Sequence, residues 1–155
     1  MKILVAFSSP KRSYQVVKAA CNFAKSNDAE LILLRVIPDP QKVGVVAQLI
    51  ATNRPFEKAQ SQINDVVEKL LKLNVKVTGL VKIGEVAKEI IKYCSEIKAD
   101  YLFLGTAKFS KPGLFFIQRD PIVRYLVDNC PVNLCLIRHE SIDSISDDEV
   151  VDFKL

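Results

Sequence analysis

The sequence predicts a doubly wound α/β domain whose mostly parallel sheet is covered by helices on both faces. Short apolar segments of strand length alternate with longer segments whose apolar residues recur at helical spacing. Most of the strand-like segments are apolar throughout, which is typical of strands buried on both faces. The 155 residues, 49% of them hydrophobic, are enough for one compact domain and too few for two.

The first part of the chain predicts two buried strands separated by a helix. Residues 3–7 (ILVAF) form a continuous apolar run that ends at Ser8-Ser9-Pro10. Ser13 is a suitable N-cap for a helix whose apolar residues continue to residue 24. Residues 31–37 (LILLRVI) repeat the buried-strand pattern, with Arg35 as the only charge, and the prolines that follow end the strand.

The rest of the chain continues the alternation. Residues 41–53 are apolar without clear caps, so a short helix and a mobile flap both remain open. Beyond them we expect a helix that begins at Pro55, an alternating edge strand, a helix, a buried strand, a short helix and a final strand, over residues 55–73, 75–81, 86–97, 100–104, 122–129 and 130–138.

A doubly wound sheet predicts where a ligand binds. Its crevice lies beyond the carboxyl ends of the strands, where neighbouring connections leave toward opposite faces. The first and fourth strands of this chain are the natural pair. Their carboxyl ends offer Ser8, Ser9 and the loop that starts at Gly105.

Composition disfavours several functional classes. No charge-free apolar run approaches the ~18 residues of a membrane span, and the N-terminal MKILVAF is too short for a signal peptide, so we expect a cytoplasmic protein. The four cysteines match neither a disulfide framework nor a zinc site, and the only histidine, His139, has no neighbour suited as a ligand or base. We therefore expect no metal site and no catalytic residues. Dispersed basic residues without an aromatic sheet motif argue against nucleic-acid binding.

Charge is distributed unevenly along the chain. Residues 139–155 hold six acidic residues and one lysine, whereas the whole chain has a net charge of +4. The body is therefore basic and the C-terminal tail acidic. A solvated, frayed tail is the simpler interpretation, and a tail that shields or mimics an anionic ligand is the alternative.

Several motifs follow one another in a recognisable order: KILVAF with Ser13 after it, AELILLRVI, KIGEVAKEIIKYCSEIKADYLFLG and CPVNLCLIR. In order and spacing they resemble the universal stress protein family over nearly the whole of residues 2–138. The resemblance implies a Rossmann-like, five-stranded sheet in the order 3-2-1-4-5. It also implies a family domain over residues 1–138 with an acidic tail over 139–155, and a homodimer formed through the last strand.

The resemblance further implies a nucleotide site, because many members of that family bind ATP. They use an aspartate after the first strand and a loop of glycine, two residues, glycine, nine residues, then glycine and serine or threonine, whose backbone N–H groups approach the phosphates. Here the aspartate position is a serine, the second glycine is a lysine, and glutamine and arginine replace the final pair. The candidate nucleotide-binding residues are Ser8, Ser9, Val36, Gly105, Thr106, Lys108, Gly113, Gln118 and Arg119.

Two interpretations of this altered loop stay open. In one, Lys108, Lys111 and Arg119 replace the backbone donors and still hold ATP, AMP or another phosphate compound. In the other, long side chains fill the space that close phosphate approach requires, and the site is lost. The sequence favours loss, because each charge-assisted hydrogen bond restores only about 1.5–3 kcal/mol.

The last strand carries the leading hypothesis. Val132, Leu134 and Leu136 lie on one face of it, and a terminal edge strand can pair with its own copy, although the acidic tail could cover that edge instead. We therefore expect a non-enzymatic regulatory or stress-response protein that acts as a homodimer through protein contacts. An adenine-nucleotide sensor is the alternative, with ATP or AMP as the only candidate cofactors, and an ATP hydrolase ranks third.

Overall fold

The expected α/β architecture is confirmed. The computed structural model describes residues 1–39, 55–107, 120–139 and 153. Strands and helices alternate along the chain as β1 (Lys2–Ala6), α1 (Tyr14–Ser26), β2 (Glu30–Ile37), α3 (Pro55–Lys72), β3 (Val77–Ile83), α4 (Val86–Glu96), β4 (Tyr101–Ala107), α5 (Pro121–Asn129) and β5 (Asn133–His139).

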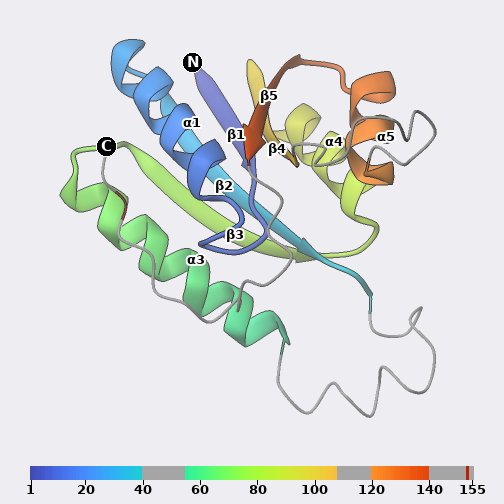
Figure 1. Ribbon diagram of the computed structural model, residues 1–155, viewed down its shortest axis with the longest axis horizontal. Helices are drawn as coiled ribbons and strands as arrows, with labels where there is room; N and C mark the ends of the chain where they lie inside the picture. The colour runs from blue at the N-terminus through green and yellow to red at the C-terminus, as the bar shows by residue number, and fades with distance from the viewer. Residues whose placement is uncertain (40–54, 108–119, 140–152, 154–155) are drawn as a thin grey trace.

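The five strands form one sheet in the order β3-β2-β1-β4-β5, and every neighbouring pair is parallel (Figure 1). This is the order that the family resemblance implied. The alternating strand, β3, lies at one edge as expected, and β5 lies at the other. The apolar strands β1 and β4 lie at the centre, because only strands covered on both faces can be apolar throughout.

Helices cover both faces of the sheet (Figure 1). On one face, α1 and α3 enclose a core that contains Val17, Ile63 and Leu70, together with Ile3 and Val5 of β1. On the other face, α4 and α5 enclose a second core around the β1 residue Leu4, completed by Leu102, Ile90 and Leu126. Consecutive residues of β1 thus point into different cores, as the two-residue period of a strand requires.

At the amino ends of the strands, three helices end in the same way. Residues Asp28, Asn74 and Lys98 have positive φ angles of 48°, 57° and 53°. The next residue in each case donates its N–H back across the turn, from Ala29 to Ala24 O, from Val75 to Leu70 O and from Ala99 to Cys94 O. These are Schellman motifs, in which apolar residues on both sides of the turn pack together.

Several element boundaries differ from those predicted, and three of the differences have a clear physical reason. Strand β4 does not end at Leu104 but continues through Gly105 and Thr106, because it pairs with β5 as far as His139. Strand β3 begins at Val77, since Val75 belongs to the turn after α3. Strand β5 begins only at Asn133, because Cys130 caps the C-terminus of α5.

Residues 41–53 lie outside the described residues, so their two alternatives remain untested. Within the acidic tail the structure describes Phe153. Its ring is stacked on Tyr14 with centroids 5.3 Å apart, and the side chain is buried in the core beneath α1 and α3. In the described parts of the chain, no helix has the length and apolarity to cross a membrane.

Candidate functional site

A cleft opens at the carboxyl ends of the strands, between β1 and β4. The connection after β1 leads to α1 on one face, whereas the chain beyond β4 leads to α5 on the other face. This divergence produces the expected crevice. The cavity has a volume of about 680 Å³, within the range of small-molecule sites.

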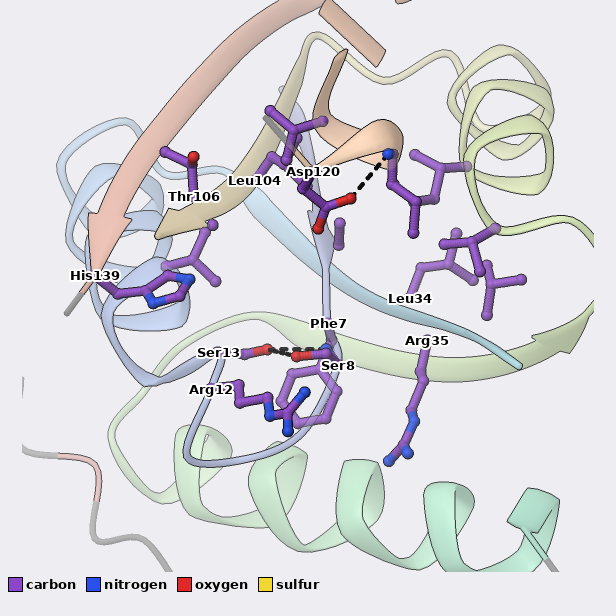
Figure 2. A pocket seen from close by; sticks show the side chains of 18 of the residues that line it. Phe7, Ser8, Arg12, Ser13, Leu34, Arg35, Leu104, Thr106, Asp120 and His139 are labelled. Carbon is purple, nitrogen blue, oxygen red and sulfur yellow. Dashed lines mark hydrogen bonds between the residues drawn. The ribbon is translucent and has the colours of Figure 1, made fainter. Parts of the chain in front are cut away.

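The turn after β1 forms one wall of the cleft and is held by two serines (Figure 2). The Ser8 N–H donates to Ser13 Oγ at 2.9 Å, and the two hydroxyl oxygens lie 3.3 Å apart. Ser13 stands at the N-cap position of α1, as predicted, but its side chain does not cap the helix. Its hydroxyl instead fixes the backbone at Ser8, which shapes the cleft.

Two cations border this wall. Arg12 lies in the turn after β1, and its guanidinium group is drawn beside Phe7 and Ser8 in Figure 2. Arg35 comes from the end of β2, and its guanidinium group donates to the Gln62 side chain on α3. Arg35, which interrupts the apolar run of β2, therefore lies at the rim of the cleft, where its side chain is partly exposed to water.

Strands β4 and β5 supply the second polar wall. Thr106 and His139 line the cleft from neighbouring strands (Figure 2). The imidazole lies over Gly105, because a Cβ atom added at that glycine would meet His139 Cδ2 at 3.3 Å. The glycine thus leaves room for the histidine ring, in addition to any role toward a ligand.

The start of α5 closes the cleft on the side opposite the Ser8 turn. Asp120 is the N-cap of this helix and accepts from the Ile122 N–H at 2.8 Å, with Pro121 in the first turn (Figure 2). The carboxylate therefore has a structural role while it also lines the cleft. Apolar residues complete the lining, chiefly Val16, Leu34, Val36, Val86, Ile90, Leu104 and Val123.

The structure brings four of the predicted site residues together: Ser8, Val36, Gly105 and Thr106. Ser9 does not line the cleft. Its side chain is buried behind the turn, where its hydroxyl accepts from the Arg12 N–H at 3.4 Å. The other four candidates, Lys108, Gly113, Gln118 and Arg119, lie outside the described residues.

Sequence analysis missed Arg12, Arg35, Asp120 and His139 as cleft residues. One signal could have found two of them, because Arg35 lies near the carboxyl end of a predicted strand and His139 directly follows the last predicted strand. His139 was expected to have no neighbour suited as a metal ligand or base, and its neighbours in the cleft include the hydroxyl side chains of Thr106 and Ser8. His139, the last residue of the edge strand β5, reaches the cleft only because β4 and β5 pair in this register.

The chemistry of the cleft suits recognition of a small anionic molecule with an apolar part. Hydroxyl donors and guanidinium groups can bind phosphate or carboxylate oxygens, and the apolar residues can contact a flat ring. Among the described residues, no three side chains of the metal-binding types are grouped so as to hold a metal ion.

The three residues expected at a dimer interface differ in exposure. Val132 and Leu134 are half-buried against the core beneath α4 and α5. Leu136 is 44% exposed, on a strand that has a neighbour on one side only within the described sheet.

Comparisons with known proteins agree with this architecture. Over 136 residues the chain is 27% identical to a universal stress protein of Methanocaldococcus jannaschii, covering 84% of this chain and 79% of the relative. The structure of UspA from Lactobacillus plantarum is similar with a TM-score of 0.67 and 19% identity, over 89% of this chain and 97% of that one.

A universal stress protein from Archaeoglobus fulgidus, solved in complex with dAMP, has a TM-score of 0.63 and 14% identity, over 88% of this chain and 96% of that one. Other similar structures contain cAMP or AMP. The model of the universal stress protein family matches residues 1–138. The chain therefore belongs to the universal stress protein family.

Proposed function

We propose that this protein is a cytoplasmic, non-enzymatic regulator that binds an adenine nucleotide in the cleft between β1 and β4. The observation that carries the proposal is the cleft itself, with a volume of about 680 Å³ and with polar and apolar walls. Relatives of the same fold have been solved with dAMP, AMP and cAMP. The described part of the site thus favours the nucleotide-binding alternative over complete loss of the site.

The distribution of side chains suggests how the nucleotide is oriented. Leu34, Val36 and Ile90 offer an apolar surface for the base. Ser8 and Arg12 offer a hydroxyl and a guanidinium group at the turn after β1, where the phosphate group can accept hydrogen bonds. In this arrangement side-chain cations do the work that glycine-loop backbone donors do in other family members.

Calorimetric titration with AMP tests the proposal. We expect micromolar affinity for the wild type and a loss of about tenfold or more in Arg12→Ala, because a charge-assisted hydrogen bond contributes about 1.5–3 kcal/mol. Lys25→Ala is the matched control, since it removes the same charge at the opposite end of α1. Titrations with dAMP, cAMP and ATP then rank the phosphate group that the cleft prefers.

The absence of heat at millimolar AMP, in protein shown to be folded by circular dichroism, would mean that the site is lost. Equal weakening in Arg12→Ala and Lys25→Ala would mean that net charge, and not the cleft, attracts the nucleotide.

A second proposal is that two copies pair through β5. The specific observation is the exposed Leu136 on the edge strand, with the exposed Tyr125 and Val127 on α5, the helix that covers the same face of the sheet. An unpaired strand edge bordered by apolar side chains is a suitable surface for a second copy. A dimer of this kind would leave the cleft at the carboxyl ends of the strands open.

Sedimentation velocity at tens of micromolar protein tests the dimer, because a stable interface has a Kd well below that concentration. We expect a dimer for the wild type and a monomer for Leu136→Asp. Leu71→Asp, at an exposed leucine of α3, should remain dimeric. A monomeric wild type, or a Leu136→Asp variant that stays dimeric, contradicts pairing through this strand.

A further inference from the structure

Two cysteines that are far apart in the sequence meet in the core beneath α4 and α5. Cys94 lies on α4 and is fully buried, whereas Cys130 caps the C-terminus of α5 and is half-buried. Both pack in the same hydrophobic cluster, where α4 and α5 lie against each other, and the Cys130 side chain is close enough to Cys94 to contribute to its raised pKa. The nucleotide site uses neither residue.

The two thiols differ in their access to solvent. Burial, with a smaller contribution from the neighbouring Cys130, raises the pKa of Cys94 to about 12. Cys94 therefore stays protonated at neutral pH and does not react with an oxidant in solution. Cys130 lies at the end of a surface helix, where a small oxidant can reach it.

We propose that Cys94 and Cys130 form a reversible intramolecular disulfide when the protein meets a peroxide. In the first step the Cys130 thiol gives its proton to solvent, and its sulfur attacks one oxygen of hydrogen peroxide. The O–O bond breaks, Cys130 becomes a sulfenic acid, and the hydroxide that leaves takes up a proton to form one water. In the second step the Cys94 sulfur attacks the sulfenic sulfur, its proton leaves with the hydroxyl group, and a second water is released. Two thiols are oxidised, and one peroxide is reduced to two waters.

The structural arrangement favours this pairing over other fates of Cys130. The resolving thiol is already in place, so the second step needs no encounter with another molecule. Cys21 lies in the core on the opposite face of the sheet, and Cys135 points toward that same face. The sheet therefore separates both of them from the Cys94–Cys130 pair.

The disulfide would tie the end of α5 to α4. Both helices contribute residues to the cleft, Val86 and Ile90 from α4 and Ile122 and Val123 from the first turn of α5. Oxidation would thus fix the relative position of the two helices on this side of the cleft. Closing the loop 94–130 should raise the Tm by about 5–15 °C. Formation of the disulfide itself is independent of the nucleotide proposal.

Peptide mapping tests the proposal directly. Trypsin releases Cys94 in the peptide 93–98, but it leaves Cys130 and Cys135 together in the peptide 125–138. The full-length Cys135→Ser variant removes this ambiguity. After treatment with hydrogen peroxide and blocking of the remaining thiols, non-reducing mass spectrometry should find these two peptides joined, with a total mass two hydrogens lower than their sum. Dithiothreitol should separate them.

Two controls make the test decisive. Cys21→Ser added to Cys135→Ser should leave the cross-link unchanged, whereas Cys130→Ser added to it should leave Cys94 reduced and abolish the rise in Tm on oxidation. The proposal is overturned if Cys94 is recovered as a free thiol from peroxide-treated Cys135→Ser protein. It is equally overturned if Cys130 is recovered only as an over-oxidised or intermolecularly linked residue. Both outcomes are read from folded protein that carries the native pair.

Discussion

The two ends of the sheet are built differently, and the difference places the cleft at which we propose nucleotide binding. At the amino ends, three helices enter strands through Schellman turns at Asp28, Asn74 and Lys98. A small hollow at this end, between α1 and the turn after α3, has a volume of about 110 Å³. At the carboxyl ends, the cleft between β1 and β4 has a volume of about 680 Å³.

The physical cause of this asymmetry is the path of the chain. A helix that leads into a parallel strand can end at a single residue in the left-handed conformation. Its last apolar residue then packs against the first apolar residue of the next strand. Where connections leave β1 and β4 toward opposite faces, a crevice opens between them that no side chain of the described residues fills. Mutations at the amino end should therefore change stability, whereas mutations at the carboxyl end should change binding.

The largest expected effect is a loss of binding when the cleft is filled. Thr106→Trp places an indole between the two polar walls, and we expect the affinity for AMP to fall by about a hundredfold, or about 2.7 kcal/mol. Thr106 is partly exposed, so the Tm should change little. Calorimetry measures the affinity. Lys25→Trp, at the small hollow of the amino end, should bind AMP as the wild type does. Unchanged binding in Thr106→Trp would place the nucleotide outside the cleft.

An intermediate effect is expected at the amino end. Asn74 has a φ angle of 57°, in the left-handed region that asparagine tolerates and a β-branched residue does not. Asn74→Val should lower the free energy of unfolding by about 1–2 kcal/mol, measured by urea denaturation. The affinity of the folded protein for AMP should not change.

Asn74→Gly is the control for this substitution, because glycine adopts the left-handed conformation without a steric penalty. Asn74→Gly should be more stable than Asn74→Val by about 1–2 kcal/mol. If the two variants were equally destabilised, the loss would come from the asparagine side chain and not from backbone strain.

The smallest effect concerns an exposed ion pair at the same end. Lys76 donates a hydrogen bond to Asp28 at 2.6 Å, and this bond and the lysine charge lower the pKa of Asp28 below its ordinary value of 3.8. Because the pKa is lower in the folded state, the pair stabilises the fold at neutral pH, and this contribution is lost as the pH falls through the folded-state pKa.

Asp28→Asn keeps a residue that tolerates the left-handed conformation and removes only the charge. We expect it to be slightly less stable than the wild type at pH 7. The difference in stability should shrink as the pH falls below 3.8 and should vanish below the folded-state pKa. Urea midpoints measured from pH 7 down to acid pH check this. A difference that persists in acid would have to arise from something other than the ion pair.

Much of the fold could be predicted from local patterns. The helix expected from Pro55 to residue 73 is found as Pro55–Lys72, and the alternating strand is found at an edge. These features depend on the spacing of apolar residues along the sequence, which is a local property. Boundaries were less accurate where pairing decided them, as at the end of β4, which extends through Gly105 and Thr106 because β5 continues beside it.

The site was predictable in position but only partly in composition. The rule for parallel sheets located it at Ser8 and the end of the fourth strand. Arg12 and His139 became site residues only through packing, because one is turned toward the cleft by the hydrogen-bonded serines and the other by strand register. The cations that line the cleft, Arg12 and Arg35, lie outside the loop motif, so the motif alone could not predict them.

By itself, the sequence determined which segments are strands or helices and which face of each is apolar, because these properties are local. The tertiary structure decided which strand ends meet. Strand β1 pairs with β4 across about a hundred residues of chain, and β4 with β5 in a register that brings His139 beside Thr106. Contacts between such distant residues depend on the packing of the whole domain. This packing brings Cys94 near Cys130, and it forms the cleft from residues of four strands.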